Sequence, residues 1–424
     1  MSVKINLPEE GKPRVVIVGG GFAGVTLAQK ISTDDFQVVL IDKNNYHQFQ
    51  PLFYQVAMAG LEPSSIIFPF RKIFQKSGKY FRLAKVLEVF PEKNCILTDR
   101  GLVNYNYLVL AMGATTSYFG NKEIQEKTIP MKSVKEAIKL RNRILEDYEN
   151  ALTCIDHKER QSYLNVVIVG GGPTGVELAG ALAEMKKYIL PKDYPELNTE
   201  IIEIFLIEGN SRLLKSMSED SSHDALKYLE NLGVKVMLNT RVESYNGNEA
   251  ITKDGKRIHT KKVIWAAGIY GVSIDGLPKN DISSSGRYLV NNYNQLEGEK
   301  DIFVLGDLAQ MNCEKYPNGH PQVAQVAIQQ ASLLATNLMR LSQSYQPSEF
   351  TYNDLGSMAT VGRHAAVADI KGFYIGGIIA WYLWLVVHLK SILGVKNKVF
   401  VLINWIWNYL SYDQSLRLII KPRK

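Results

Sequence analysis

The stretch Val15-Val-Ile-Val-Gly19-Gly20-Gly21-Phe22-Ala23-Gly24 decides the fold of this chain. A β-branched run leads into the pattern G-x-G-x-x-G, and a helix-like segment follows from Val25 to Ile31. The pattern predicts a strand, a tight turn and a helix N-terminus that can hold a phosphate, because glycine permits both the turn and the close approach of a ligand. Alone, such a motif is a weak signal.

A second copy of the motif, Val166-Val-Ile-Val-Gly170-Gly171-Gly172-Pro173-Thr174-Gly175, begins 151 residues later. Each copy is followed by another β-branched run that ends in an acid, Asp42 in the first case and Glu208 in the second. A carboxylate at this position can accept hydrogen bonds from both hydroxyls of an adenosine ribose, and it repels a 2′-phosphate. The alternative is that each acid only ends a strand. The doubled pattern predicts two dinucleotide-binding sites.

Three further segments carry an apolar run into a glycine. They are Phe303-Val-Leu-Gly306-Asp307, Leu108-Val-Leu-Ala-Met-Gly113 and Val263-Ile-Trp-Ala-Ala-Gly268. With the two glycine motifs they resemble the flavoprotein superfamily that has two dinucleotide-binding domains, over residues 14 to about 335. The resemblance implies that the first motif binds FAD, that the second binds NAD(P)H and that Asp307 holds the ribityl chain. Glu208 then favours NADH over NADPH.

Composition agrees with a globular enzyme. The chain has 424 residues, 46% hydrophobic and 21% charged, which is enough for two or three ordinary domains. Cys95, Cys154 and Cys313 are odd in number and far apart, so neither a disulfide framework nor a metal site is expected. The first fourteen residues lack the apolar core of a secretory signal.

The charge of the chain is concentrated at its end. Residues 371–424 hold eight of the 49 basic and one of the 42 acidic side chains, so this segment carries the whole net charge of +7. It also holds four of the five tryptophans, in the apolar stretches Gly372 to Leu389 and Val399 to Leu410. Aromatic rings and lysines at the ends of apolar helices are typical of a membrane interface.

These features predict a monotopic, amphipathic helical anchor on an anionic membrane surface. A spanning helix is the first alternative, although 18 residues between Lys371 and Lys390 fall short of the roughly 20 that a bilayer needs. A homodimer through the same helices is the second. Nucleic acid is excluded as a partner, because the basic region is apolar and has no groove-reading motif.

A membrane-bound enzyme that oxidises a soluble nucleotide is expected to use a lipid-soluble acceptor such as a quinone. The segments His47 to Ala57 and Ala324-Gln325-Val-Ala-Ile-Gln329-Gln330 closely resemble signatures of the type II NADH:quinone oxidoreductases. The run from Trp381 to Lys398 is also similar to theirs. This resemblance implies a non-proton-pumping respiratory enzyme on the cytoplasmic face of the cell membrane, with a hydride passing from NADH to FAD and two electrons to the quinone.

Other members of the superfamily depend on cysteines. Disulfide reductases and sulfide:quinone reductases need a redox-active cysteine pair beside the flavin, and the three cysteines here lie outside all the motifs.

A second alternative is a membrane-associated sensor or scaffold that binds FAD and NADH without depending on turnover. The glutamines between 325 and 330 argue against it, since a sensor needs no quinone pocket.

Two residues are the expected catalytic groups. Glu177 lies in the first turn after the second motif, where it serves either as a charge or proton relay beside the flavin or only as an acid at a helix N-terminus. The family resemblance favours the relay. It also places Gln325 at the flavin ring and the quinone headgroup. Gln329 lies one helical turn further on the same face, where it either supports the quinone site from behind Gln325 or serves helix packing.

The predicted fold is α/β, with two Rossmann-like domains and the C-terminal anchor. The FAD domain takes residues 12–115 and 286–345, the segment 116–160 connects, the NADH domain takes 161–285, and the anchoring region takes 346–424. The expected cofactor-binding residues are Gly19, Gly21, Phe22, Ala23, Gly24, Asp42, Lys43, Ala111, Gly113, Gly306, Asp307, Gly170, Gly172, Pro173, Thr174, Gly175, Glu208, Ala267 and Gly268.

Overall fold

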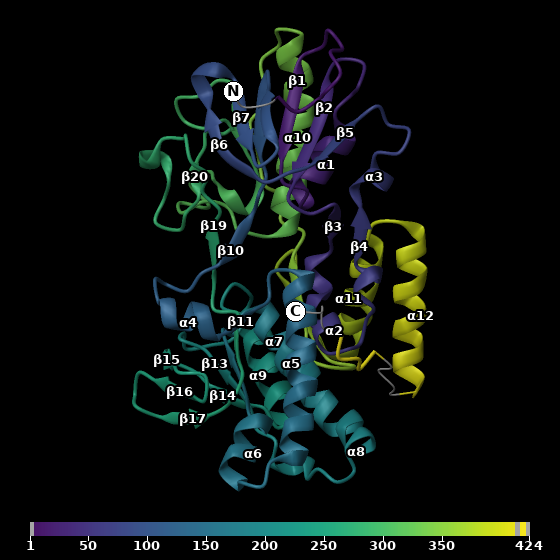
Figure 1. Cartoon of the computed structure of the whole chain (residues 1–424), viewed down its shortest axis with the longest axis vertical. Helices are drawn as coiled ribbons and strands as arrows, with labels where there is room; N and C mark the ends of the chain where they lie inside the picture. Colours follow the sequence, from purple (N-terminus) through teal and green to yellow (C-terminus); the bar gives the residue numbers. More distant parts are fainter. Residues whose placement is uncertain (1–3, 412–415, 421–424) are drawn as a thin grey trace. The chain divides into compact units, whose positions relative to one another are not determined.

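The computed structural model describes residues 4–411 and 416–420, and its chain divides into two compact units (Figure 1). Unit 1 contains residues 1–47, 68–115 and 269–354, and unit 2 contains residues 48–67, 116–268 and 355–424. Three of the basic residues counted above, Lys421, Arg423 and Lys424, lie outside the described residues.

Unit 1 is built on a five-stranded parallel sheet. Its strands lie in the order β21 (Ile302–Val304), β9 (Tyr107–Leu110), β1 (Arg14–Val18), β2 (Gln37–Asp42) and β5 (Tyr80–Leu83). Nearly every residue of β1 and β2 is buried, which is why these strands read as continuous apolar runs. The helices α1 (Phe22–Lys30) and α10 (Ala324–Ser342) pack on each other, and β6, β7 and β8 (Val86–Phe90, Cys95–Thr98 and Gly101–Asn104) form a separate antiparallel sheet.

Unit 2 repeats this plan. Its parallel sheet has the order β11 (Ile129–Pro130), β18 (Val263–Trp265), β12 (Val166–Val169), β13 (Ile204–Ile207) and β14 (Lys235–Met237). The antiparallel strands β15, β16 and β17 (Val242–Tyr245, Glu249–Thr252 and Arg257–His259) correspond to the small sheet of unit 1. The helices of this part are α4 (Lys122–Lys127), α5 (Val134–Thr153), α6 (His157–Leu164), α7 (Pro173–Glu184), α8 (Leu190–Asp193) and α9 (Glu219–Asn231).

The compact units differ from the expected domain bounds in three places. The segment 116–160 is no free connector, because β11 joins the second sheet and α5 packs against α2 (Phe53–Ala57). The whole segment 48–67 belongs to unit 2, although it lies within the expected FAD domain. The expected anchoring region also belongs to unit 2 from residue 355 onward.

The C-terminal region contains a small sheet that the sequence reading did not predict. Strands β23 (Ser357–Thr360), β24 (Ala366–Ile370) and β25 (Phe373–Gly376) are antiparallel, so the apolar stretch from Gly372 starts as a strand. Helices α11 (Gly377–Ser391) and α12 (Val395–Ser411) follow and pack on each other. Gly377 has φ +69°, a conformation that suits glycine at this strand-to-helix junction.

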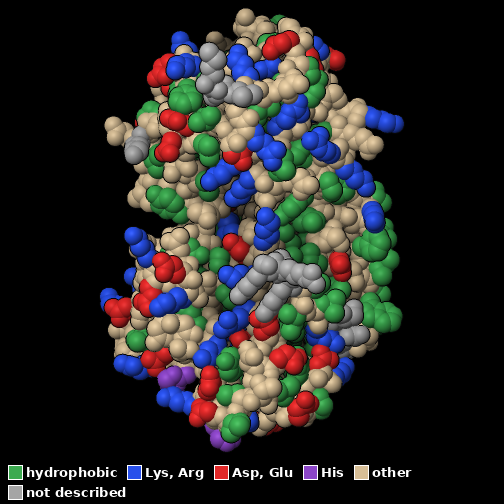
Figure 2. Space-filling model, in the orientation of Figure 1, with side chains coloured by type: hydrophobic (Ala, Val, Ile, Leu, Met, Phe, Trp, Pro, Cys, Tyr) green, Lys and Arg blue, Asp and Glu red, His purple; other side chains and the backbone are tan. Residues whose placement is uncertain are grey.

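Much of the surface of α12 is apolar. Figure 2 shows hydrophobic side chains, in green, gathered at the edge where Figure 1 places this helix. Phe400, Ile403 and Ile406 are each more than half exposed, whereas Trp384 on α11 is 1% exposed and belongs to the core. Trp384 is therefore not an interfacial ring, contrary to the expectation for all four C-terminal tryptophans. None of the helices within residues 4–411 is both long and apolar enough to cross a bilayer.

A buried ion pair ties α5 to the sheet of unit 2. Lys262 Nζ lies 3.0 Å from Asp147 Oδ2, and both side chains are at most 1% exposed. The ammonium also donates to the carbonyl of Tyr163, and Asp147 accepts a hydrogen bond from Arg143. Burial lowers the pKa of Lys262, and Asp147 opposes that shift. Removing the acid would leave an ammonium without a counterion in the core.

We expect Asp147→Ala to destabilise unit 2 by about 3–5 kcal/mol, because the uncompensated charge of Lys262 remains buried. The measurement is the urea midpoint of unfolding, followed by circular dichroism.

The matched control is Glu159→Ala, which removes a surface pair with Lys261 whose N···O distance is 3.6 Å. That change should cost less than about 1 kcal/mol. Equal midpoints for the two variants would contradict a structural role for the buried pair.

Candidate functional site

The first glycine turn in unit 1 is shaped by close packing. A Cβ on Gly19 would lie 2.4 Å from the carbonyl oxygen of Ala111, and one on Gly24 would lie 1.8 Å from that of Gly19. Both positions therefore exclude any larger residue. A Cβ on Gly21, in contrast, would meet no protein atom within 4 Å. The space in front of Gly21 lies at the N-terminus of α1, where no side chain caps the helix.

Asp42 fixes this turn from the end of β2. Its carboxylate accepts hydrogen bonds from the backbone N–H of Gly20 at 2.7 Å and of Asn44 at 2.6 Å. Burial raises the pKa of Asp42, and these two hydrogen bonds act in the opposite direction. His47 is buried with its Nδ1 3.0 Å from the carbonyl oxygen of Gly20, so it supports the same turn. The sequence reading left the role of this histidine open.

Two glutamine side chains hydrogen-bond to the backbone of the Gly306-Asp307 segment. Gly306, at φ +68°, donates its N–H to Oε1 of Gln330 at 2.8 Å. Gln322 donates to the carbonyl of Asp307 at 2.8 Å. Gln330 is part of the family signature quoted from the sequence, but neither glutamine was assigned to the support of this segment. A buried glutamine on an apolar helix face is the signal that could have marked it.

The second glycine turn, in unit 2, repeats the first. A Cβ on Gly170 would lie 2.4 Å from the carbonyl oxygen of Ala266, and one on Gly175 would lie 1.9 Å from that of Gly170. A Cβ on Gly172 would again meet nothing within 4 Å, and no side chain caps the N-terminus of α7. Glu208 accepts the N–H of Gly171 at 2.5 Å. The two turns therefore share the same close contacts and the same hydrogen bond from the middle glycine to an acid.

These observations test whether dinucleotides fit the two turns. Each turn combines an uncapped helix N-terminus with space that protein packing does not use, and backbone N–H groups there suit a pyrophosphate. Each acid lies at the carboxyl end of the second strand, where an adenosine ribose binds in this fold. Asp42 accepts the backbone N–H groups of Gly20 and Asn44. Glu208 accepts that of Gly171 and two N–H groups of Asn210. At most one or two of the roughly four lone pairs of each carboxylate therefore remain for a ribose hydroxyl.

The remaining expected residues cluster at the same turns. Phe22 and Ala23 open α1, whereas Pro173 and Thr174 open α7. Lys43 follows β2 directly and is exposed. The others follow strands β9 and β18 at the carboxyl edges of the two sheets; these are Ala111, Gly113, Ala267 and Gly268.

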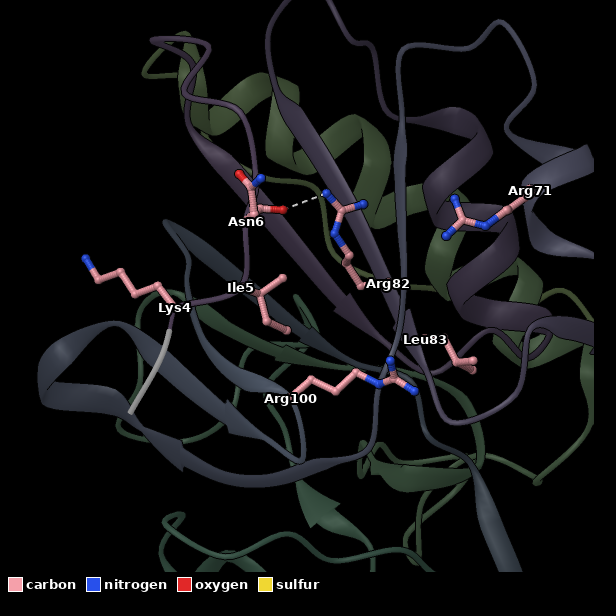
Figure 3. A pocket seen from close by; sticks show the side chains of 7 residues that line it. All are labelled: Lys4, Ile5, Asn6, Arg71, Arg82, Leu83 and Arg100. Carbon is pink, nitrogen blue, oxygen red and sulfur yellow. Dashed lines mark hydrogen bonds between the residues drawn. The ribbon is translucent and has the colours of Figure 1, made fainter. Parts of the chain in front are cut away.

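A basic cavity of about 420 Å³ adjoins the end of β2 in unit 1 (Figure 3). Four cations line it, namely Lys4, Arg71, Arg82 and Arg100. Leu83, which also lines it, pairs in register with Asp42. The positive field of this cavity therefore lies next to the proposed adenosine site.

Glu177 is buried in unit 2, one turn into α7. Its side chain is 9% exposed, and burial raises its pKa to about 8. The backbone N–H of Thr360 acts against this shift, as does the indole N–H of Trp384, although the indole makes no hydrogen bond of standard geometry. The carboxyl group thus keeps its proton at neutral pH. An acid at an exposed helix N-terminus would not have its pKa raised in this way. The surroundings of Glu177 therefore do not match the simpler alternative of an acid that only stabilises a helix N-terminus.

The groups around Glu177 come from segments far apart in the chain. Tyr54 on α2 places its hydroxyl 3.0 Å from Oγ1 of Thr360 on β23, and Trp384 comes from α11. His388, stacked on Trp384 at 4.0 Å between ring centroids, has its pKa lowered to about 4 by burial. It is therefore neutral near pH 7 and is a poor proton donor. The sequence reading did not select Tyr54, Thr360 or Trp384 for this role.

The two expected quinone-site glutamines lie on α10 in unit 1. Gln325 lies in the first turn of the helix and is half-buried. Gln329 uses both ends of its amide on the backbone of Asn353, accepting its N–H at 3.0 Å and donating to its carbonyl at 2.8 Å. Gln329 therefore fastens the segment after α10. Its role in quinone binding stays a prediction that these contacts do not favour.

Family models match almost the whole chain. The model described as pyridine nucleotide-disulphide oxidoreductase matches residues 13–331, and the model described as NDH2 C-terminal domain matches residues 355–411. The described cysteines are all unpaired, and Cys95 is buried whereas Cys313 is exposed.

Curated relatives agree with these models. The type II NADH:quinone oxidoreductase Ndh of Mycobacterium tuberculosis is 33% identical over 94% of this chain and 88% of its own length. The type II NADH:quinone oxidoreductase of Haemophilus influenzae is 29% identical over 84% of this chain and 86% of its own length.

The fold also matches a solved structure along its length. The structure of NDH2 from Plasmodium falciparum in complex with NADH superposes with a TM-score of 0.88 over 97% of this chain and all of that one, at 21% identity. The family resemblance drawn from the sequence is confirmed. This chain belongs to the type II NADH:quinone oxidoreductase family.

Proposed function

We propose that the protein is a non-proton-pumping NADH:quinone oxidoreductase that contains FAD. The observation that carries this proposal is the pair of glycine turns, each closed by its own acid, in a chain of this family. When bound, FAD accepts a hydride from NADH and gives two electrons to a quinone. The protein contributes binding, orientation and protons.

The residues of unit 1 hold FAD in this proposal. The N–H groups at the start of α1 bind the pyrophosphate, Asp42 binds the adenosine ribose and Asp307 binds the ribityl chain. Gln330 and Gln322 keep the Gly306-Asp307 segment in place through its backbone. Gln325 faces the quinone headgroup. In unit 2 the start of α7 binds the NADH pyrophosphate, and Glu208 binds its adenosine ribose.

Glu177 supplies a proton for quinone reduction. Quinol formation takes up two protons, and a buried carboxyl group that is protonated at pH 7 can deliver one where water is scarce. Its pKa of about 8 lies near the working pH, which favours transfer in both directions.

The exposed face of α12 attaches the protein to the membrane. Phe400, Ile403 and Ile406 enter the headgroup region, while Lys390 and Lys396 remain exposed beside it and attract anionic lipids. Attachment is on the cytoplasmic face, where NADH is available. A homodimer through the same face is the competing arrangement.

We expect the purified protein with FAD to reduce a short-chain quinone with NADH far faster than free flavin does, and with NADPH poorly. Glu208→Gln should lower kcat/KM for NADH by about tenfold or more, since hydrogen bonds to a charged acceptor are lost. The ratio of kcat/KM for NADH to kcat/KM for NADPH should fall as well. Anaerobic stopped-flow traces of flavin reduction measure both effects.

The control for this comparison is Asp42→Asn, which should weaken FAD retention without changing the choice of nucleotide. A wild-type rate no better than that of free flavin would defeat the proposed activity. Equal use of both nucleotides by the wild type would defeat only the role of Glu208.

We expect quinone reduction to fall as the pH rises through about 8, because Glu177 has lost its proton above its pKa. Glu177→Gln should remove this limb and slow the quinone step by about a hundredfold, the usual contribution of a positioned acid. Steady-state rates from pH 6 to 10 provide the profile, and single-turnover flavin reduction isolates the NADH step. An unchanged alkaline limb in the variant would contradict this role.

We expect the triple change Phe400→Ser, Ile403→Ser and Ile406→Ser to release the protein from vesicles that contain anionic lipid. Losing roughly 1.5 kcal/mol of apolar burial per side chain lowers partitioning about a thousandfold. Vesicle sedimentation is the measurement.

Ile155→Ser, at a site that is 90% exposed, is the matched control and should sediment as the wild type does. If the triple variant still sediments but changes from dimer to monomer, the face is a subunit interface and the membrane assignment is wrong.

A further inference from the structure

Phe119 is a large apolar side chain that unit 2 leaves in solvent. It shortly precedes α4, its side chain is 73% exposed, and its backbone has φ +50°. Positive φ is a costly conformation for a bulky residue, because its Cβ comes too close to the following carbonyl oxygen. Neither the exposure nor the backbone conformation of Phe119 therefore stabilises the fold.

The turn that contains Phe119 normally takes other residues at this position. The N–H of Asn121 donates to the carbonyl of Tyr118 at 2.9 Å, and the two central residues, Phe119 and Gly120, both have positive φ. This is the pattern of a type I′ turn, whose first central position favours glycine, asparagine or aspartate. Residues held in costly conformations cluster at functional sites, because the strain persists only where the surrounding structure enforces it. The turn therefore directs attention to the ring that it exposes.

The turn is fixed on the carboxyl end of β18. Ser117 donates its N–H to the carbonyl of Gly268 at 3.0 Å, and its own carbonyl accepts the indole N–H of Trp265 at 2.8 Å. The ring of Tyr118 stacks on that indole, with 6.2 Å between ring centroids. These contacts hold the exposed ring of Phe119 in place before any ligand binds.

The exposed ring lies against Gly268. The Cζ atom of Phe119 is 3.4 Å from the point where a Cβ of Gly268 would stand, and Gly268 has φ +147°. Gly268 shortly follows β18 at the carboxyl edge of the parallel sheet. Ligands of this fold bind outside that edge. The ring therefore borders the dinucleotide site of unit 2.

The order of the strands assigns one half of the dinucleotide to this place. Glu208 follows β13, the glycine turn follows β12 and Gly268 follows β18, and these strands are neighbours in the order β13, β12, β18. The acid takes the adenosine ribose, and the start of α7 takes the pyrophosphate. The other half of NADH, which carries the nicotinamide, therefore continues toward the end of β18.

We propose that Phe119 is a binding residue for the nicotinamide half of NADH, which its ring contacts beside Gly268. The ring loses contact with water when the ligand binds, and this apolar burial favours the complex. Because the turn already fixes the ring, binding costs little conformational freedom. This inference rests on the proposed function, since it adds a contact within the NADH site.

The test measures the dissociation constants of NAD⁺ and of ADP for the FAD-loaded protein by isothermal titration calorimetry. ADP contains the adenosine ribose and a diphosphate but no nicotinamide. Phe119→Gly should therefore weaken NAD⁺ binding about tenfold and leave ADP binding unchanged. Phe119→Tyr keeps the ring and should restore most of the affinity for NAD⁺. Since glycine suits the positive φ, the urea midpoint of Phe119→Gly should stay close to that of the wild type.

Two control variants show which half of the ligand is affected. Glu208→Gln should weaken NAD⁺ and ADP alike, because this acid binds the adenosine ribose that both ligands contain. Ile155→Ser removes another exposed apolar side chain of unit 2 and should change neither dissociation constant.

The outcomes separate this inference from the proposed function. A wild type that binds neither NAD⁺ nor ADP defeats both. If the wild type binds both ligands and Phe119→Gly binds them equally well, the inference alone is overturned. An equal loss of NAD⁺ and ADP binding in Phe119→Gly also overturns it, because the ring then acts on the adenosine half or on the fold. So does a Phe119→Tyr variant that binds NAD⁺ as weakly as Phe119→Gly.

Discussion

Each dinucleotide-binding unit depends on one hydrogen bond, from the second glycine of the turn to the acid at the end of the neighbouring strand. Gly20 donates to Asp42 and Gly171 donates to Glu208. The bond can form only because the first and last glycines bring strand and helix close together, where a Cβ would strike a carbonyl oxygen. It fixes the turn, and in the proposed function it leaves the helix N-terminus to a phosphate and the carboxylate to a ribose. The rest of both sites is arranged around this contact.

Glu177 is a second buried polar group whose surroundings set its charge state. Burial alone would favour the neutral acid, while Thr360 and Trp384 stabilise the charged form enough to keep the pKa within reach of neutral pH. A carboxyl group in this balance can exchange a proton under working conditions. Lys262 and Asp147 show the other solution, in which opposite charges are paired in the core and serve stability.

The glycine turns and their acids could be read from the sequence because their geometry is local. Strand, turn and helix lie within about ten residues, and backbone sterics permit only glycine at Gly19 and Gly24. The strands β1, β2, β12 and β13 were recognisable for a related reason, since burial on both faces gives continuous apolar runs. The sheet β23 to β25 escaped notice because its last strand runs directly into an apolar helix, and composition alone does not separate the two.

The sequence by itself determined the two dinucleotide-binding units, the acid that closes each turn and, through resemblance, the family. Only the tertiary structure decided which side chains surround Glu177. Tyr54, Thr360 and Trp384 come from three elements spread over about 330 positions of the chain. Only the tertiary structure showed which of the C-terminal tryptophans lie in the core and which lie at the surface. Such contacts depend on how elements pack across long separations, which no local pattern of residues encodes.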